Sequence, residues 1–269
     1  MIPLFMKTII FTDLDGTFLN HDDYSYSDSL RAVTKVLDED IPLIFSTSKT
    51  KIEVELLHEK LKIKEPFIVE NGAAIFIPKA YKNIDFSFLE EYGNYYIYQL
   101  GLSYEDILKF YNKYKNEFEM LGFSDMNKWE LMKHTKLDSQ IANLAKQRNF
   151  TEPFVLADDT KLNKLEKLAL ENGIKVTKGG RFYHLIGIDQ DKGKAVIQAK
   201  KIFEKVFNED IKSIALGDGQ NDIPMLENVD VPIIIKNHKG EYLKCKIKNI
   251  QKSTYKGSTG WGEMVLKNV

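Results

Sequence analysis

The sequence holds a single cysteine and no long apolar run, and each shortage excludes a class of protein. Cys245 has no second cysteine in the chain, so an internal disulfide and a cysteine-rich zinc site are both excluded. The longest apolar stretches have the length of a β-strand, which is too short for a helix to cross a membrane. Residues 1–5 lack the charge and the length of a secretory signal. We therefore expect a cytoplasmic protein with no membrane partner.

The chain also lacks an excess of charge of either sign. Its 38 lysines and arginines nearly balance its 39 aspartates and glutamates, which gives a formal net charge of -1. Nucleic-acid binding depends on a positive field, so this balance argues against nucleic acid as a partner. A small molecule is the expected partner, and the oligomeric state is left open.

At 269 residues the chain is long enough for two domains, because single cores tend to stop growing at about 250 residues. Short apolar runs that end in polar or glycine-rich turns are typical of buried parallel strands, and amphipathic helical patterns separate them. This alternation predicts a doubly wound, Rossmann-like parallel sheet. The expected strands are residues 8–11, 42–45, 67–69, 214–216 and 231–235.

The alternation breaks between about Ile84 and Gly187, where the chain is rich in Tyr and Phe. Helical patterns accompany short strand-like segments there. We therefore expect an α/β core domain of residues 1–83 and 187–269, with an α+β cap domain of residues 84–186 inserted into it.

Two acidic residues follow the first apolar run, in the motif Asp13-Leu14-Asp15-Gly16-Thr17. Ligands of open parallel sheets bind at the carboxyl ends of the strands, so a substrate could reach Asp13 there. One Asp can serve as a nucleophile and the other as an acid/base, and a cation such as Mg2+ would offset their repulsion. An ordinary strand-to-turn junction contains the same residue types, so this motif alone leaves both interpretations open.

A second acidic cluster follows the fourth apolar run, in the segment Gly217-Asp218-Gly219-Gln220-Asn221-Asp222. Its glycines permit a tight turn that can point Asp218 and Asp222 to one place, and paired carboxylates suit a hard cation. Asp222 could also cap the helix expected to begin at Ile223.

Two further segments carry groups that suit a phosphate. Lys192 stands just before a long amphipathic helix, where an ammonium and the helix N-terminus would both favour an anion. Ser46, Thr47 and Ser48 follow the second apolar run and can donate hydroxyl hydrogen bonds. The alternatives are a solvated lysine, and a helix cap formed by Thr47 or Ser48.

Taken in the order Asp-x-Asp-Gly-Thr, Ser/Thr, Lys and Gly-Asp-Gly-x-Asn-Asp, these motifs resemble the haloacid dehalogenase superfamily of phosphohydrolases. The resemblance implies that Asp13 attacks phosphorus to form an aspartyl-phosphate and that Asp15 is the acid/base. It implies that Thr47 and Lys192 stabilise the phosphoryl group. The implied cofactor is Mg2+, with four residues that hold it or orient its water: Asp13, Asp15, Asp218 and Asp222.

The expected cap position, between the third strand and the lysine motif, matches one type within the superfamily. The usual second motif of that type reads Thr-Gly-Arg, whereas this chain has Thr47-Ser48-Lys49-Thr50. The departure resembles the mannosyl-3-phosphoglycerate phosphatase family, as do residues 69–73, 147–154 and 179–184. The resemblance extends over nearly the full chain, as far as Gly260-Trp261-Gly262.

A sugar ester of phosphoglycerate offers a phosphate, a carboxylate and many hydroxyls to its protein. Arg148 and Arg181 could grip an anion bidentately, while Glu152, Asn71 and His184 could bind hydroxyls. Each has an alternative, because an arginine can be solvated and a histidine can be a satisfied core residue. The expected substrate-binding residues are Ser48, Lys49, Asn71, Arg148, Thr151, Glu152, Gly180, Arg181, His184 and Asn221.

The resemblance thus predicts a Mg2+-dependent phosphatase that converts mannosyl-3-phosphoglycerate to mannosylglycerate, a compatible solute. The nearest alternative is a phosphatase of glucosyl-3-phosphoglycerate or another sugar phosphate, since sugar epimers differ in the direction of one hydroxyl. A phosphotransferase or mutase, and a non-catalytic phosphosugar-binding module, are further alternatives. Asp15 and Asp218 argue against the binding module, because simple binding requires neither.

Overall fold

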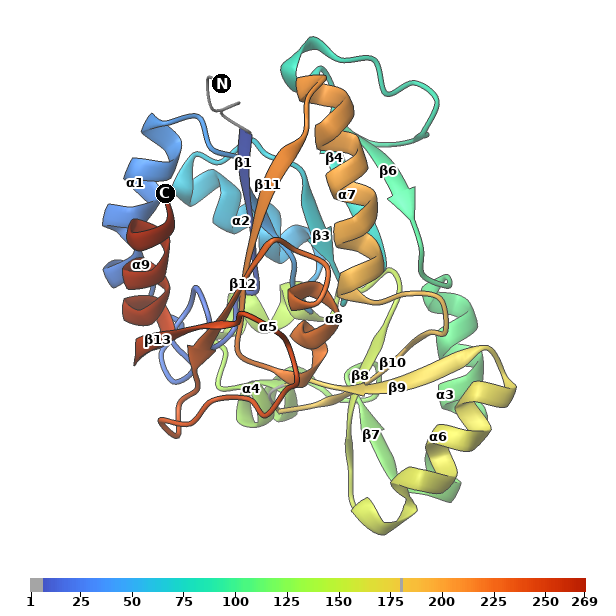
Figure 1. The fold of residues 1–269 in the computed structure, drawn as a ribbon. Coiled ribbons are helices and arrows are strands. Elements are labelled where there is room, and N and C mark those ends of the chain that lie inside the picture. The colour runs from blue at the N-terminus through green and yellow to red at the C-terminus, as the bar shows by residue number, and fades with distance from the viewer. Residues whose placement is uncertain (1–6, 180) are drawn as a thin grey trace.

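The structure, a computed structural model, describes residues 7–179 and 181–269. Within these residues, the central layer is a parallel sheet of five strands in the order β13-β12-β11-β1-β2 (Figure 1). Strand β1 pairs with both β2 and β11, so segments from the two halves of the chain lie side by side at its centre. The strands are β1 (Lys7–Thr12), β2 (Leu43–Phe45), β11 (Ile211–Gly217), β12 (Val231–Lys236) and β13 (Gln251–Lys256).

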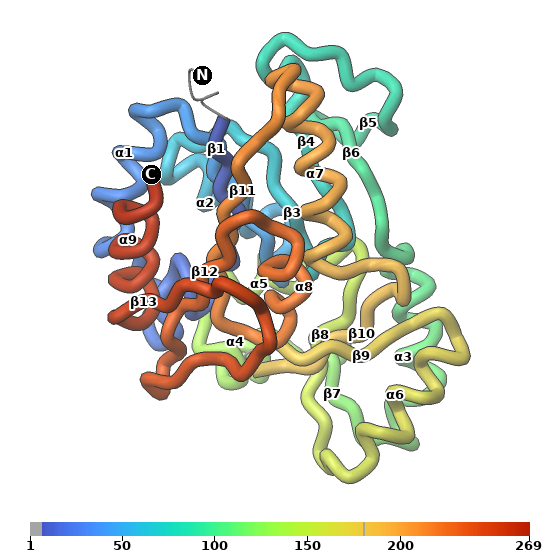
Figure 2. Tube along the Cα trace, in the orientation of Figure 1, coloured from blue at the N-terminus to red at the C-terminus, as the bar shows by residue number. Residues whose placement is uncertain are grey.

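Helices cover both faces of this sheet. Successive side chains of a strand point to opposite faces, and in the buried strands they are apolar on both faces, so each face packs against helices. Ile10 lies in the apolar cluster of one face, and its neighbours Ile9 and Phe11 lie in the cluster of the other. Figure 2 shows α1 and α9 on one side of the sheet and α7 and α8 on the other. The helices are α1 (Leu30–Asp38), α2 (Lys51–Leu61) and α9 (Gly257–Asn268) on the first face, with α7 (Lys192–Phe207) and α8 (Ile223–Leu226) on the second.

A second sheet continues the central layer beyond β2. Strand β3 (Phe67–Val69) lies beside β2 through a parallel bridge between Ser46 and Ile68. It then pairs antiparallel with β4, which pairs in turn with β6, and β6 with β5. The remaining strands are β4 (Ala74–Pro78), β5 (Glu90–Tyr92) and β6 (Tyr95–Gln99).

The predicted α/β fold with a parallel-sheet core is confirmed. The five expected strands correspond to β1, β2, β3, β11 and β12. Strand β13 was not expected, because most of its side chains are polar and exposed, as suits the edge of a sheet.

An antiparallel sheet in the order β7-β8-β10-β9 forms a separate layer over the carboxyl ends of the parallel strands. One of its faces packs on α3 and α6, while α4 and α5 pack with Leu121 and Val155. Its strands are β7 (Met120–Gly122), β8 (Glu152–Leu156), β9 (Ile174–Lys178) and β10 (Tyr183–Gly187). Its helices are α3 (Tyr104–Phe118), α4 (Lys128–Thr135), α5 (Ser139–Ala145) and α6 (Leu162–Glu171).

The predicted cap boundaries, 84 and 186, stay a prediction, but the packing favours a later start. Strand β6 pairs with β4, and Phe86 and Ile97 lie in the two apolar clusters of the central layer. We therefore propose a cap of residues 101–187. From the sequence we placed the Tyr-rich segment before residue 101 in the insertion, because no local pattern in the sequence indicates that its strand β6 pairs with β4.

Short 3-10 turns complete the secondary structure, at Ser27–Ser29, Tyr81–Asn83, Asp159–Lys161 and Gln220–Asp222. Across the described ranges, no helix combines the length and the apolar character that crossing a membrane requires.

Candidate active site

The loop after β1 carries Asp13 and Asp15 at the carboxyl end of the parallel sheet. Asp13 is 6% exposed, and its backbone N–H donates to Leu216 O of β11 at 2.9 Å. Gly16 allows the sharp exit with a φ of +87°. A Cβ on Gly16 would lie only 2.6 Å from Asp218 Oδ2, so glycine also lets the two acidic loops approach each other.

Lys192, the first residue of α7, bridges two of the acidic residues. Its Nζ lies 2.5 Å from Asp13 Oδ1 and 2.6 Å from Asp222 Oδ1, and the ammonium is fully buried. Burial opposes the charge, but Asp13 and Asp222 raise the pKa of Lys192 above its ordinary value. The lysine is therefore a buried cation paired with two carboxylates, not a solvated one.

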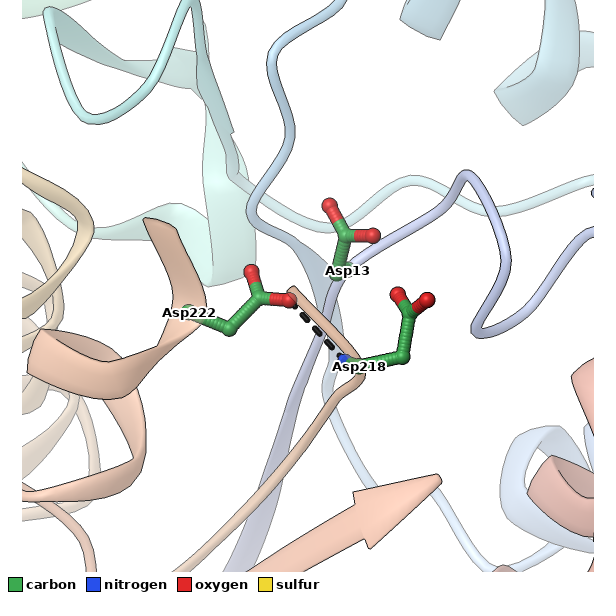
Figure 3. A group of neighbouring side chains, drawn as sticks. All are labelled: Asp13, Asp218 and Asp222. Atoms are coloured by element: carbon green, nitrogen blue, oxygen red, sulfur yellow. Dashed lines mark hydrogen bonds between the residues drawn. The ribbon is translucent and has the colours of Figure 1, made fainter. Parts of the chain in front are cut away.

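Three carboxylates, those of Asp13, Asp218 and Asp222, lie close together (Figure 3). Asp13, Asp218 and Asp222 each offer an oxygen, and these oxygens lie within 4.8 Å of one another. Burial raises the pKa of Asp13 to about 7, and the Asp222 charge adds to this rise while Lys192 opposes it. Burial, with Asp13 and Asp222 nearby, also raises the pKa of Asp218 well above its ordinary value. The three carboxylates, when all are ionised, would thus carry more negative charge than Lys192 balances.

Asp222 does not cap α8 with its side chain. Its Oδ2 instead accepts hydrogen bonds from Asp218 N at 3.0 Å and from Gly219 N at 2.9 Å. Thr17 Oγ1 donates to Asp218 Oδ1 at 2.9 Å. These contacts hold both acidic side chains of the turn in place.

Asp15 lies outside this cluster of three carboxylates. Its side chain is 36% exposed and lies 2.9 Å from Lys49 Nζ, which also approaches Glu53 at 3.7 Å. Burial opposes the charge of Lys49, but Asp15 and Glu53 raise its pKa above the ordinary value. The predicted role of Asp15 as a metal ligand stays untested, since its carboxylate is not in the cluster of three.

Thr47 and Ser48 lie on the loop after β2, and neither caps α2. Thr50 is the N-cap, in a capping box with Glu53. Thr47 is fully buried, and its Oγ1 accepts from Lys49 N at 3.1 Å. The helix-cap alternative for Thr47 and Ser48 is therefore wrong.

A cavity of about 320 Å³ lies between these loops and the cap. Asp13, Asp15 and Asp218 lie in its core wall. Six of the predicted substrate-binding residues also line it: Ser48, Lys49, Arg148, Arg181, His184 and Asn221.

Arg181 reaches from the cap to the core at the cavity. It donates to the backbone oxygen of Thr135, to His21 O at 2.9 Å and to Tyr24 OH at 3.3 Å. Nearby, His184 is buried, and its Nδ1 has no hydrogen-bond partner among the described residues. Burial lowers the pKa of His184 to about 3, so its ring is neutral. The expected contact at Gly180 lies outside the described residues.

Three expected substrate contacts are instead bound by protein atoms. Arg148 Nε and Nη2 donate to Thr151 Oγ1, at 3.1 and 2.8 Å. Glu152 accepts from Tyr104 OH at 2.6 Å and from Ser124 Oγ at 2.7 Å. The predicted substrate contacts of Arg148, Thr151 and Glu152 stay untested, but none of the three has a wholly free polar side chain.

Asn71 lies deeper, next to the acidic turn. Its Oδ1 accepts a hydrogen bond from Asn221 Nδ2 at 3.0 Å, while its buried Nδ2 has no partner within 7–179 and 181–269. Two of the predicted substrate-binding residues thus contact each other at the carboxyl ends of β3 and β11.

Sequence reasoning missed part of the cavity wall. His21 and Tyr24 line it, as do His238 and other residues of the long segment between β12 and β13. The rings of His21 and His238 stack, with centroids 4.0 Å apart. In the sequence, the position of the segment between β12 and β13 was the available indication that it lines the cavity, because it follows the carboxyl end of a predicted parallel strand.

Comparison with known proteins gives the family. The family model of haloacid dehalogenase-like hydrolases matches residues 10–258, which is most of the chain. The chain belongs to this family. A protein of Persephonella marina named glucosyl-3-phosphoglycerate/mannosyl-3-phosphoglycerate phosphatase is 48% identical to this hydrolase over 259 residues, or 96% of each chain. A protein of Methanococcoides burtonii with the same name is 41% identical, over 97% of each chain.

Solved structures share the fold of this hydrolase. The crystal structure of Thermoplasma acidophilum 0175 superposes with a TM-score of 0.71, covering 97% of this chain and 98% of that one. The two sequences are 17% identical, so this likeness concerns the fold alone.

Proposed function

We propose that this hydrolase is a phosphatase that removes phosphate from glucosyl-3-phosphoglycerate and mannosyl-3-phosphoglycerate. The observation that carries the proposal is the buried Lys192 between Asp13 and Asp222, where Asp13 also lines the cavity between the core and the cap. A carboxylate nucleophile next to a fixed cation suits attack on an anionic phosphoryl group. The names and high identity of the two relatives support the substrate class.

The proposed chemistry has two steps at Asp13. Asp13 Oδ attacks phosphorus, the bond to the ester oxygen breaks, and Asp15 gives that oxygen a proton. Asp15 then takes a proton from water, which attacks the aspartyl-phosphate and frees Asp13. Thr47 and Lys192 donate hydrogen bonds to the phosphoryl oxygens throughout. The 36% exposure of Asp15 supports its role, because it must reach both the leaving oxygen and water.

We propose Mg2+ as the cofactor. Hard cations take oxygen ligands, and the cluster of Asp13, Asp218 and Asp222 supplies carboxylate oxygens only, with negative charge that Lys192 does not balance. When bound, Mg2+ would neutralise the phosphoryl oxygens. Asp13 and Asp218 would hold it directly, with Asp15 as a further ligand, and Asp222 would orient its water.

The cap would hold the part of the substrate beyond the phosphate. Its side of the cavity brings Arg181 and neutral His184 opposite the phosphoryl site. Together with Lys49 they suit a carboxylate and sugar hydroxyls. We propose Ser48, Lys49, Asn71, Arg181, His184 and Asn221 as the substrate contacts.

Both sugars enter the proposal because each relative is named for both. Epimers at one carbon differ in a single hydroxyl, and a cavity of about 320 Å³ with several polar side chains can accept either direction. Transfer of the phosphoryl group to a second sugar, as in a mutase, is the alternative that the experiment must separate.

The test is a set of phosphatase assays with Mg2+ on glucosyl-3-phosphoglycerate, mannosyl-3-phosphoglycerate, mannose 6-phosphate and p-nitrophenyl phosphate. We expect phosphate release from the first two at a kcat/KM well above the others, with no acceptor sugar present. Loss of the ester only when a sugar is added, with the phosphoryl group recovered on that sugar and not as free phosphate, would point to a phosphotransferase or mutase. Release from p-nitrophenyl phosphate alone would contradict the substrate class but not the phosphatase.

The Asp13→Asn variant tests the nucleophile in the same assays. The amide keeps the shape of the side chain but cannot attack phosphorus, so we expect turnover to be lost on every ester while the thermal unfolding remains cooperative. Appreciable activity in this variant would remove Asp13 from the proposed role.

A further inference from the structure

Glu70, on the loop between β3 and β4, has a completely buried side chain. Its Oε1 accepts a hydrogen bond from Asn149 N at 2.8 Å. Its Oε2 accepts from Phe150 N at 3.2 Å, from Thr151 N at 2.9 Å and from Thr151 Oγ1 at 2.9 Å. One carboxylate of the core thus binds three consecutive backbone N–H groups of the cap.

Arg148 joins the same contact from the cap. Its Nε lies 3.4 Å from Glu70 Oε2 and donates to Thr151 O at 2.9 Å. Its Nη2 donates to Ser48 O at 2.8 Å, on the core loop that also carries Thr47. The guanidinium therefore connects the cap to the core loop that would contact phosphate.

The backbone of Glu70 adds two further contacts. Its N–H donates to Lys49 O at 3.0 Å, and its carbonyl accepts from Gln190 Nε2 at 2.8 Å. Gln190 lies on the segment that returns from the cap to the core, and its Oε1 accepts from Gly187 N at 3.0 Å. The loop after β2, the cap and the returning segment all meet at this one residue.

The backbone conformation of Glu70 is unusual. Its φ is +48°, in the left-handed region that glycine adopts without strain and that costs other residues free energy. A glutamate in this turn therefore costs free energy that a glycine would not. Its carboxylate contacts supply the stabilisation that a glycine could not.

We propose that Glu70 is the positioning residue that fixes the cap over the phosphoryl site, with Arg148 as its partner. It acts through the backbone of residues 149–151. The proposal rests on the proposed function, because it assumes that the cap holds the sugar part of the substrate. A substrate that reaches the cap depends on the Glu70 contact, whereas a small phosphate ester does not.

The loop that carries Thr47 has its own support. Thr47 N donates to Ile68 O at 3.1 Å, and Asn71 N donates to Thr47 O at 2.9 Å. Neither bond involves the side chain of Glu70. Loss of that carboxylate should therefore disturb the cap more than the phosphoryl site.

The experiment compares the wild type with Glu70→Gln, whose amide group would face at least one of the cap N–H donors with a donor of its own. We expect kcat/KM for mannosyl- and glucosyl-3-phosphoglycerate to fall by at least about tenfold, since small misplacements of binding groups are costly. For p-nitrophenyl phosphate we expect a change of less than about threefold. Amide hydrogen exchange at residues 149–151 should become at least about tenfold faster.

Glu65→Gln is the matched control. Glu65 precedes β3 at its other end, and its carboxylate accepts a hydrogen bond from Tyr81 OH, away from the cap. This variant should leave both the ratio of the two activities and the exchange at 149–151 unchanged. Equal losses on both kinds of substrate in Glu70→Gln, or unchanged exchange at 149–151, would overturn the proposal.

Arg148→Lys keeps the proposal testable if Glu70→Gln does not fold. A lysine retains the charge but cannot bridge Glu70 and Ser48 as the planar guanidinium does. We expect the same change in the activity ratio, in a smaller amount, and an unchanged ratio would overturn the proposal. A wild type that hydrolyses only p-nitrophenyl phosphate would contradict the proposed function, while exchange at 149–151 would still test Glu70.

Discussion

Asp15 differs from the other acidic residues of the site in its surroundings. Asp13 and Asp222 are buried against Lys192, whereas Asp15 is 36% exposed and pairs with Lys49. Four carboxylates that look alike in the sequence thus divide into a cluster of three and a more accessible acid. This division supports different roles for Asp13 and Asp15.

Asp15→Asn should lower kcat on the sugar ester by about 10²–10⁴-fold, the usual contribution of a positioned acid/base. The loss should be much smaller for p-nitrophenyl phosphate in the first step, because p-nitrophenolate leaves without a proton. Steady-state and burst kinetics on both esters would measure this. Asp210→Asn, on the exposed segment before β11 at the opposite end of the strand, is the control; an undiminished rate on the sugar ester would remove Asp15 from catalysis.

Asp218→Ala should raise the Mg2+ concentration needed for half-maximal activity, because it removes one carboxylate from the cluster of three. EDTA should silence the wild type, and added Mg2+ should restore it. Titration of activity with Mg2+ in both proteins gives the comparison. If the two titrations coincide, Asp218 serves the turn and not the metal.

At the scale of elements, helix α7 carries Lys192 at a position where a cation opposes the helix dipole. Asp191 is its N-cap, and Asp191 Oδ1 accepts from Lys194 N at 2.7 Å. The preceding loop is packed tightly, since a Cβ on Gly72 would lie 2.2 Å from Asp191 O. The element thus holds its lysine against an unfavourable dipole through capping and close packing.

Asp191→Ala should lower the free energy of unfolding by about 1 kcal/mol, within the usual range for loss of an N-cap. Chemical denaturation at neutral pH would measure it. Asp191→Asn is the matched control, because asparagine caps a helix about as well as aspartate. Equal losses of unfolding free energy in both variants would mean that the negative charge of Asp191 matters more than its cap. Lys175 Nζ lies 3.6 Å from Asp191 Oδ2 and would be the partner of that charge.

At the scale of the whole molecule, His58 couples folding to pH. It lies buried on α2 between Phe45 and Phe67, with ring centroids 5.1 Å from each. Burial lowers the pKa of His58 from 6.5 to about 4. The unfolded chain therefore binds this proton more readily than the folded one, so the contribution of His58 to stability is full above pH 6.5 and is lost as pH drops towards 4.

His58→Leu should flatten this acid dependence. The pKa difference corresponds to about 3 kcal/mol of unfolding free energy that the wild type loses between pH 6.5 and 4 and that the variant keeps. Urea denaturation at several pH values in this range would test it. His134→Gln, at an exposed position of α4, is the control. Parallel curves for wild type and His58→Leu would contradict the assignment.

The local pattern of the sequence was sufficient for the core of the fold. Ile9, Ile10 and Phe11 are apolar in succession because both faces of β1 are covered, and such runs are visible without a structure. Strand β13 and the hairpin of β5 and β6 were not visible in this way. Strand β13 pairs with β12, and β6 pairs with β4. A long segment of chain separates the two strands of each pair, so no local pattern in the sequence indicates the pairing.

The sequence by itself determined that the loops carrying Asp13, Thr47 and Asp218 would lie at one edge of the sheet, because parallel strands end at a common edge. Only the tertiary structure decided what the predicted cap residues contact. Arg148 and Arg181 both line the cavity and look equivalent in the sequence, yet the first is bound to Glu70 and Ser48 while the second crosses to His21 and Tyr24. The physical reason is that a contact between cap and core depends on how two separately packed layers meet. The local pattern of apolar and polar residues in the sequence does not indicate that arrangement.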